Sequence, residues 1–361
     1  MFTPGRLSLA RRRRKLTKKG LAEAAGFDQK TIIRYENGEV APPLESLAVL
    51  ARVLDFPGDF FSGPEIDEPP TEAVSFRSLK ALLARDRDAA LAACAFAFLL
   101  NDWVSDRFSL PAPDLIDFKE DTDPETAARH LRQKWGLGER RVRNMVHLLE
   151  AKGIRVFSLT ENTRALDAFS MWRNETPFIF LNTTKTAERS RFDAAHELGH
   201  LVLHQHGGPN GRLAEDQANQ FASAFLMPKA EVQARLPRVK FLTEVIQAKR
   251  LWDVSASALN YRLHKLGVTT DWQYRRFCIQ IVDQFGQSEP FGISKEQSML
   301  WDKVLGYLKA DHITKHKIAN NLQLPVAEIE NLLFGLTNMQ SIDGFGIGQS
   351  KWRAKLKIIT N

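Results

Sequence analysis

The segment His196-Glu197-Leu198-Gly199-His200 is the most informative part of this 361-residue chain. Two histidines four residues apart lie about one turn apart on one face of an α-helix, so both imidazoles can reach a single metal ion. The adjacent glutamate is directed toward the same space. This HExxH spacing is typical of two zinc ligands and a general base for metal-assisted hydrolysis. The chain holds only 9 histidines, which disfavours a chance match.

The flanking residues predict that this helix is buried. Phe192, Ala195, Leu198, Leu201 and Val202 recur at helical spacing. Burying two unpaired histidines would be costly, so they need partners. The alternative to a metal site is two core histidines bonded to backbone carbonyls. The complete motif in its helical setting favours the metal site.

A second amphipathic helix is predicted over residues 213–227, ending before Pro228. Zinc needs a third protein ligand and an open position for water. Glu215, in the first turn of this helix, is the predicted third ligand. Asn219, one turn on, is predicted to hold a ligating histidine by its second ring nitrogen. Asp216 is the weaker candidate, and the alternative for Glu215 is a solvated first-turn carboxylate.

Four stretches around this motif resemble the ImmA/IrrE family of zinc peptidases: HELGHLVLH at 196–204, EDQANQFASAFLMP at 215–228, TPFIFLNTTKTAERSRFDAAHELGH at 176–200 and VSASALNYRLHKLG at 254–267. The resemblance covers about residues 125–345. It implies a gluzincin-like active site with His196, His200 and Glu215 as zinc ligands. It also implies Glu197 as the catalytic glutamate, and limited cleavage of a partner protein, often an XRE-type repressor. Many members have an acidic residue where this chain has Gln217.

The sequence does not single out the residue that would stabilise the oxyanion. His204, His206, Tyr261 and His264 are the candidates. The alternatives are that His204 packs one turn beyond His200 and that Tyr261 is a partly buried core residue.

The region before the motif predicts a small sheet. Three strands are expected, at Ile154–Leu159, Ala168–Trp172 and Phe178–Leu181, with residues 173–176 as the last turn. Helices are expected before them, at Glu125–Trp135 and Arg140–Lys152. This order predicts an α+β fold that is mostly α, not a doubly wound parallel sheet. The edge beside Phe178–Leu181 could accept an extended substrate as an added strand.

The N-terminus predicts a second, all-helical domain. Thr17 can cap a helix that Gly26 ends, Asp28 can cap the next helix, and Leu44–Leu54 supplies another. This helix, turn, helix arrangement resembles the XRE-type helix-turn-helix over about residues 5–62, closing with Tyr-Glu-Asn-Gly at 35–38. It implies double-stranded DNA as a partner. The family often has Gln at the position of Lys18.

The charge distribution agrees with DNA binding. Residues 1–40 hold ten Lys and Arg against four Asp and Glu, a net of +6 of the chain's +7. The alternative for Arg11–Lys15 is a solvated helix face. A single helix-turn-helix reads few bases, so a homodimer on a two-fold operator is expected. The predicted DNA contacts are Lys18, Gln29, Lys30, Thr31, Arg34 and, for phosphate, Arg12.

Length and composition suggest two to three domains. The predicted parts are the DNA-binding domain at 1–62, a linker with connecting helices at 63–124, the zinc peptidase domain at 125–270 and a helical C-terminal region at 271–361. The linker is expected at Pro57–Pro70, connecting helices at Ser75–Phe108 and a loop at Pro111–Pro124. Lys315–Leu333 reads as another helix, turn, helix. Its balanced charge, with Glu328 and Glu330, favours a packing or partner-binding role.

A cytoplasmic protein without membrane contact is expected. The longest apolar run, Ala89–Leu100, is too short to span a bilayer and is expected to be a core helix. No signal peptide is apparent. Cys94 and Cys278 lie far apart and are expected to be buried thiols, not a disulfide.

Two functions fit the sequence. The first is a DNA-binding transcriptional regulator with an active zinc endopeptidase that cleaves a repressor-type partner or itself. The second is a non-catalytic DNA-binding repressor or antitoxin whose peptidase fold is a sensor or partner-binding module. The intact His196, Glu197, His200 and Glu215 favour the first, because a vestigial site would be expected to lose at least one of them.

Overall fold

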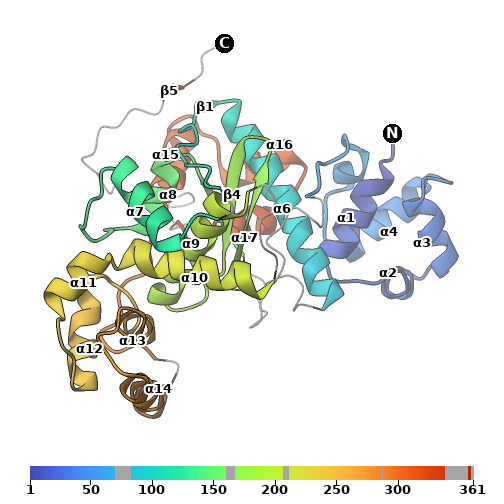
Figure 1. Cartoon of the computed structure of the whole chain (residues 1–361). Helices are drawn as coiled ribbons and strands as arrows, with labels where there is room; N and C mark the ends of the chain where they lie inside the picture. Colours follow the sequence, from blue (N-terminus) through green and yellow to red (C-terminus); the bar gives the residue numbers. More distant parts are fainter. Residues whose placement is uncertain are drawn as a thin grey trace.

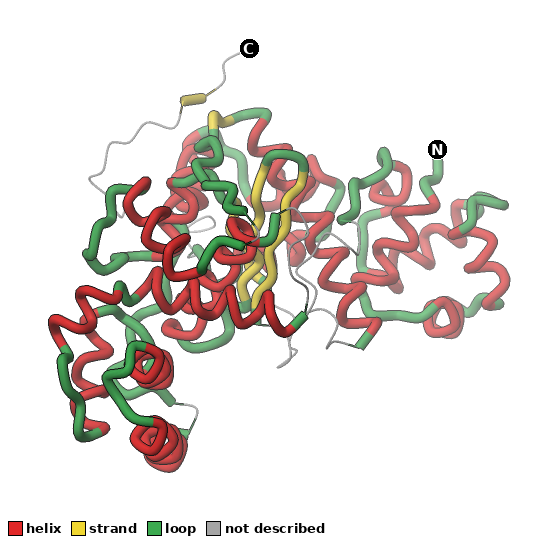
Figure 2. The backbone as a smooth tube through the Cα atoms, viewed as in Figure 1, coloured by secondary structure: helices red, strands yellow, loops and turns green. Residues whose placement is uncertain are grey.

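The computed structural model describes residues 1–69, 83–119, 121–159, 167–205, 211–286, 288–337 and the strand at 357–358. The described chain is mostly helical around a small mixed sheet, which confirms the predicted α+β class (Figures 1 and 2). The N-terminal helices lie at one end of the molecule, beside a long helix that leads to the sheet (Figure 1).

The central sheet has three strands in the order β2-β4-β3. They are β2 (Arg155–Ser158), β3 (Ala168–Arg173) and β4 (Thr176–Leu181). β2 runs parallel to β4, and β3 runs antiparallel to it through a tight turn in which Asn174 has a φ of 53°. The predicted strands are therefore present. The predicted edge is wrong: Phe178–Leu181 lies in β4, which is paired on both sides, so β3 and β2 are the edge strands.

The side chains of the sheet alternate between two hydrophobic cores, as the pleat requires. Val156, Ile179 and Leu181 join the core around the helix of the histidine motif. Phe157 and Phe178 point to the other face and join a core that continues into the N-terminal helices. Both faces are therefore buried, which explains why the strands are apolar runs and not alternating ones.

The motif helix packs against one face of the sheet, and further helices surround it. Their bounds are α7 (Pro124–Lys134), α8 (Met145–Ala151), α9 (Ala187–Leu203), α10 (Arg212–Leu226), α11 (Lys229–Arg235), α12 (Leu242–Ala248) and α13 (Ala256–Lys265). α9 carries the motif and packs closely on α10 at Gly199, where a Cβ would lie 3.1 Å from Phe221 and 3.3 Å from Ala218. A larger residue there would push apart the two helices that carry the predicted ligands.

The helix expected over Arg140–Lys152 is shorter than predicted. α8 begins only after Asn144, whose Oδ1 accepts a hydrogen bond from the His147 amide at 2.8 Å. The preceding residues form turns held by the buried Arg132, which donates to the carbonyls of Gly138 and Arg140. The apolar spacing of this segment predicted a longer helix, but the Asn144 cap and the turns bound by Arg132 delay its start to Met145.

The N-terminal domain contains α1 (Pro4–Arg13), α2 (Lys18–Ala25), α3 (Gln29–Glu36) and α4 (Leu44–Leu54). As predicted, Thr17 and Asp28 accept hydrogen bonds from Gly20 N and Lys30 N, and Gly26 ends α2 with a φ of 73°. A 3-10 helix, η1 (Gly58–Ser62), follows. Its Phe60 and Phe61 are fully buried, so the first part of the expected linker belongs to the core.

The long helix α6 (Ala84–Ser105) is buried between the N-terminal domain and the sheet. Residues 75–82 of the expected connecting helices lie outside the described residues. At 22 residues α6 is long and apolar enough to cross a membrane. The expectation that the apolar segment around Ala89–Leu100 is too short to span a bilayer is therefore wrong. However, 78% of its apolar window is buried inside the protein, as expected for a core helix.

The C-terminal region is helical where it is described. It contains α14 (Asp271–Phe285), α15 (Met299–Ala310), α16 (Lys315–Leu322) and α17 (Val326–Leu333). The short strand β5 (Lys357–Ile358) pairs with β1 (Phe108–Ser109). α16 and α17 form the predicted helix, turn, helix, with Gln323 in the left-handed conformation. α17 packs on β2 and α6.

The arginine run of α1 is not a solvated face, contrary to the simpler expectation for Arg11–Lys15. Arg11 and Arg13 are buried. Arg11 pairs with Glu36 at 2.6 Å, and Arg13 and Arg14 both pair with the buried Glu328 of α17, at 2.7 and 2.5 Å. Arg11 therefore stabilises the N-terminal domain internally, whereas Arg13 and Arg14 hold this domain to α17.

Candidate functional site

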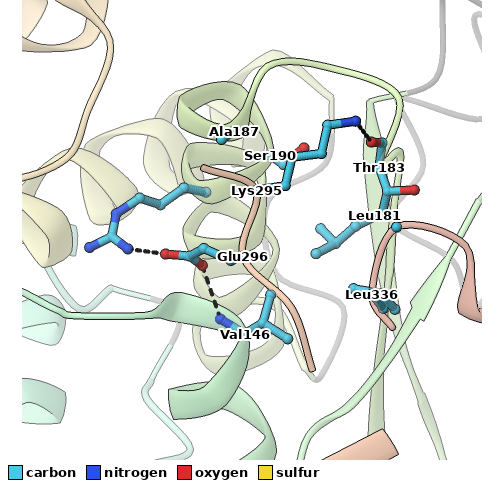
Figure 3. A pocket seen from close by; sticks show the side chains of 10 residues that line it. Val146, Leu181, Thr183, Ala187, Ser190, Lys295, Glu296 and Leu336 are labelled. Atoms are coloured by element: carbon cyan, nitrogen blue, oxygen red, sulfur yellow. Dashed lines mark hydrogen bonds and ion pairs between the residues drawn. The ribbon is translucent and has the colours of Figure 1, made fainter. Parts of the chain in front are cut away.

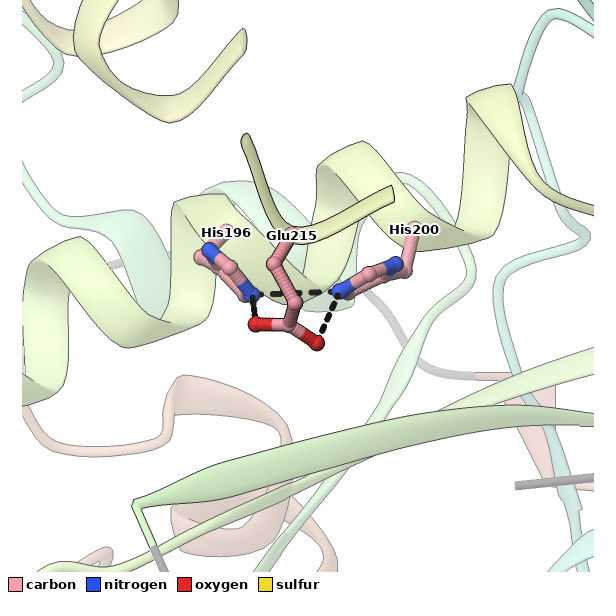
Figure 4. Close-up of side chains that lie close together, drawn as sticks. All are labelled: His196, His200 and Glu215. Atoms are coloured by element: carbon pink, nitrogen blue, oxygen red, sulfur yellow. Dashed lines mark hydrogen bonds and ion pairs between the residues drawn. The ribbon is translucent and has the colours of Figure 1, made fainter. Parts of the chain in front are cut away.

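Three side chains from two helices converge on one point (Figure 4). His196 and His200 lie one turn apart on α9, and Glu215 lies in the first turn of α10. The two histidine Nε2 atoms are 3.1 Å apart, and the Glu215 carboxylate oxygens lie 3.6 and 3.7 Å from them. One donor atom from each residue can therefore face the same ion.

The donor set suits zinc. Ligands at about 2.0–2.1 Å from a tetrahedral zinc ion lie roughly 3.3 Å from one another, close to these separations. Two imidazole lone pairs that face each other at 3.1 Å repel unless a cation or a proton lies between them. Two neutral imidazoles and one carboxylate are a common ligand set for catalytic zinc, with one position left open.

Hydrogen bonds to the outer ring nitrogens orient both histidines. Asn219 Oδ1 lies 3.0 Å from His196 Nδ1 and can accept its proton. His200 Nδ1 lies 2.9 Å from His204 Nδ1, and His204 Nε2 lies 2.9 Å from Gln217 Oε1. Because Gln217 Oε1 can only accept, His204 is protonated on Nε2 and accepts from His200 Nδ1–H. Both Nε2 lone pairs are then available to a metal.

The protonation equilibria reflect this buried setting. Burial is the largest effect on the pKa of His200 and, with His196 and His204, holds it well below its ordinary value. Burial also acts to lower the pKa of His196, but Glu215, Glu197 and Asp193 outweigh it, so this pKa is raised. Neutral His200 is the form that binds metal.

Glu197 lies beside the ligand pair and is almost completely buried. Ser170 of β3 donates its hydroxyl to Glu197 Oε2 at 2.7 Å. Burial raises the pKa of Glu197 to about 7, while His196 and the Ser170 hydrogen bond act in the opposite direction. A carboxylate with a pKa near neutrality can both take and return a proton, as a general base must.

The helix-turn-helix presents polar residues to solvent. Gln29, Lys30 and Arg34 on α3 are exposed and Thr31 is partly exposed, whereas Ile32 packs into the core. These four positions share the outward face of the second helix, which is the one that enters the major groove in this motif. The α1 side of the domain is different, because its arginines are engaged within the protein.

Two of the predicted DNA contacts, Arg12 and Lys18, already have partners within the chain. Arg12 Nη2 lies 2.6 and 2.7 Å from the two Glu68 carboxylate oxygens. Lys18 Nζ is 3.5 Å from Glu36. A phosphate would have to compete with both ion pairs, which the sequence did not indicate.

Two family models match this chain. Residues 149–264 match the IrrE N-terminal-like domain of the M78 peptidase family, and residues 7–61 match a helix-turn-helix domain. The chain combines an IrrE-like domain with a helix-turn-helix. The IrrE-like match spans β2 to α13 and contains the three candidate metal ligands His196, His200 and Glu215. Comparisons with curated proteins and with solved structures gave no match.

The other residues predicted for the IrrE-like site lie in different settings. Asp216 points away from the ligand pair, toward Arg212 at 3.8 Å. His264 on α13 stacks on Tyr274, and its Nε2 lies 3.5 Å from Asp271 of α14. Tyr261 of the same helix contacts Lys265. His206 lies outside the described residues.

Ser170, Gln217 and His204 form contacts around the site that the sequence reasoning missed or left open. A signal for Ser170 was present, because it is a polar residue between Ala168 and Trp172 on one face of an apolar strand. Its partner could not be read from the sequence, since Glu197 is 27 residues away.

A small cavity behind α9 is too small to be a substrate site. It is lined by residues including Val146, Leu181 and Leu336, and Glu296 and Lys295 border it (Figure 3). Lys295 donates to Thr183 O at 2.6 Å, and Glu296 accepts from Val146 N at 3.2 Å. Its volume of about 20 Å³ holds roughly one water molecule.

Proposed function

We propose that this chain is a DNA-binding transcriptional regulator whose zinc-dependent, gluzincin-like endopeptidase domain makes limited cleavages in a regulatory protein. The substrate is a repressor-type partner or the chain itself. The carrying observation is the convergence of His196, His200 and Glu215, with Glu197 buried beside them, in a chain that also has a helix-turn-helix domain. We further propose that the protein acts in the cytoplasm, where it meets DNA.

Each residue has a distinct chemical role in this proposal. His196, His200 and Glu215 would hold zinc, which when bound supplies Lewis-acid chemistry that polarises a carbonyl and acidifies water. Glu197 takes the proton of the attacking water and returns it to the leaving amine. Ser170 is a positioning residue, because its hydroxyl holds Glu197 Oε2. Asn219 and His204 orient the two ligand histidines.

The proposed substrate is an extended segment of protein. β3 is an edge strand, and α9 packs against it, with Ser170 linking the two. An extended peptide that adds to an edge strand gains backbone hydrogen bonds without a sequence requirement. Side-chain pockets would then set specificity.

Zinc content tests the ligand assignment. The purified protein is expected to bind about one zinc ion per chain. His196→Ala and His200→Ala should lose most of it, whereas Glu197→Gln should retain it because the ligands are intact. His264→Ala is the matched control, since its contacts are with α14. Stoichiometric zinc in the double His196→Ala, His200→Ala variant would exclude the assignment.

Cleavage tests the catalytic proposal. Wild type and Glu197→Gln are incubated with an XRE-type repressor encoded next to this chain, with and without DNA and added zinc or manganese. Products from wild type alone, including fragments of the chain itself, support the endopeptidase. Equal products from both proteins indicate a contaminating protease. Zinc binding without products under any condition favours the alternative, a DNA-binding protein whose peptidase fold acts as a sensor.

A further inference from the structure

The helix α14 has two apolar faces, and among the residues that the structure describes only one of them is packed against the rest of the chain. Phe277 and Ile281 are buried against the neighbouring helices. On the opposite face Trp272, Ile279 and Val282 are 66%, 62% and 65% exposed. Isolated apolar residues at a surface are common, but these three share one face of a single helix and form a stripe along it.

We propose that this stripe is a homodimer interface in which α14 packs antiparallel against α14 of a second copy. A two-fold axis through Ile279 brings each residue before Ile279 opposite the residue equally far after it. Arg275 then faces Asp283 of the partner copy, four positions on either side. The stripe is therefore complementary to itself in charge, and the ion pair forms twice.

The same register gives each large side chain a suitable neighbour. Trp272 lies opposite Gly286, where a Cβ would meet no atom within 4 Å, so space is available for an indole. Arg276, which covers Trp272 with a cation–π contact at 5.1 Å, lies opposite Val282. An arginine stem can cover an apolar side chain while its charge stays in water. Ile279 packs on its own copy.

This contact is independent of metal binding and of cleavage. α14 lies at the opposite end of the molecule from α2 and α3 (Figure 1). The dimer therefore leaves both helix-turn-helix domains at its outer ends, and it forms without DNA. It does not bring two recognition helices onto neighbouring half-sites, so a DNA-induced pairing would be a separate event.

Sedimentation equilibrium of the full chain tests the interface. Wild type is expected at twice the 40.9 kDa of one chain at micromolar concentrations. Ile279→Glu places two like charges across the axis and should give a monomer. Because Ile279 is exposed, the Ile279→Glu variant should keep the wild-type fold, which an unchanged melting temperature verifies. Gln284→Arg, an exposed position of α14 away from the stripe, is the matched control and should stay dimeric.

A charge exchange tests the register. Arg275→Glu and Asp283→Arg should each shift the equilibrium at least tenfold toward monomer, because like charges then face each other. The double variant restores opposite charges and should recover the wild-type dimer. A monomeric wild type, a dimer that survives Ile279→Glu, or a double variant no better than the single ones would each overturn the proposal. The first of these outcomes would mean that the stripe serves a different partner.

Discussion

The pKa of Glu197 at the candidate site is set by opposing effects of burial and of neighbouring side chains. Burial favours the protonated form of Glu197, whereas His196 and the Ser170 hydroxyl, which donates to it, favour the carboxylate. The balance leaves the pKa of Glu197 at about 7. A general base needs this compromise, because a weaker base takes protons poorly and a stronger one is protonated before it can act.

Ser170→Ala is expected to raise the pKa of Glu197 further. The carboxylate is the active form of a base, so the acid limb of the kcat/KM profile should move to higher pH. Activity near neutral pH should fall by roughly tenfold, the order of one lost charge-assisted hydrogen bond. Zinc content should not change. Ser170→Thr keeps the hydroxyl and is the control; an unchanged pH profile in Ser170→Ala would contradict the positioning role.

Glu150 shows how one buried carboxyl can join two elements. It lies at the end of α8 and accepts hydrogen bonds from Ser298 Oγ and from the amides of Met299 and Leu300 at the start of α15. Burial raises its pKa to about 7, against the three hydrogen bonds, which lower it. The sequence offers no hint of this cap, because its partners are about 150 positions away.

The stability of the fold should therefore depend on pH through Glu150. Its folded-state pKa exceeds the ordinary value of 4.5, so its contribution is full below about pH 4.5 and is lost as pH rises through 7. The shift corresponds to roughly 3 kcal/mol, at about 1.4 kcal/mol per pKa unit. Glu150→Gln cannot titrate. Urea unfolding should show wild type losing stability relative to this variant between pH 5 and 8; parallel pH curves would refute the assignment.

The contact between α1 and α17 joins the N-terminal domain to the C-terminal region. Glu328 is 1% exposed and forms ion pairs with Arg13 and Arg14. A buried ion pair adds little net stability when complete, but removing one partner leaves buried charge unpaired.

Glu328→Ala should therefore destabilise the docking of the N-terminal domain by about 3–5 kcal/mol. Hydrogen exchange of the α1 amides should accelerate accordingly. The matched control is Glu330→Ala on the same helix, where the carboxylate is 41% exposed and pairs with Lys315; its effect should stay within about 1 kcal/mol. Equal effects of both variants would show that Glu328 does not anchor the domain.

On the scale of the whole molecule, the basic residues of the N-terminal domain fall into two groups: those paired within the chain and those exposed to solvent. Most of the α1 arginines bind acidic groups of the same chain and are buried or half-buried. On α3, Lys30 and Arg34 are exposed on the outward face, where Arg34 has only a solvent-exposed ion pair with Glu39 at 3.7 Å. The net +6 of residues 1–40 therefore overstates the charge that DNA can meet. The DNA-facing surface is narrower than the sequence suggested and centres on α3.

Measurements of DNA binding should distinguish the roles of Lys30 and Arg34. Arg34→Ala should cost about 1–3 kcal/mol at the preferred site and much less on random DNA, if Arg34 reads a base edge. Lys30→Ala should weaken both equally and lower the salt slope by about 0.9 if it contacts phosphate. Lys317→Ala, an exposed charge of α16, is the control. Failure of wild type to bind duplex DNA at low salt would contradict the DNA-binding role itself.

The sequence alone was sufficient for features that depend on neighbours in the chain. The caps at Thr17 and Asp28, the three strands and the HExxH spacing all follow from local backbone preferences and from periodicity. The tertiary structure was needed for contacts between distant residues. It placed Phe178–Leu181 in the centre of the sheet, brought Ser170 to Glu197 and joined Arg13 to Glu328 across 315 positions. The physical reason is that hydrophobic periodicity specifies which face of an element is buried, but not which element covers it.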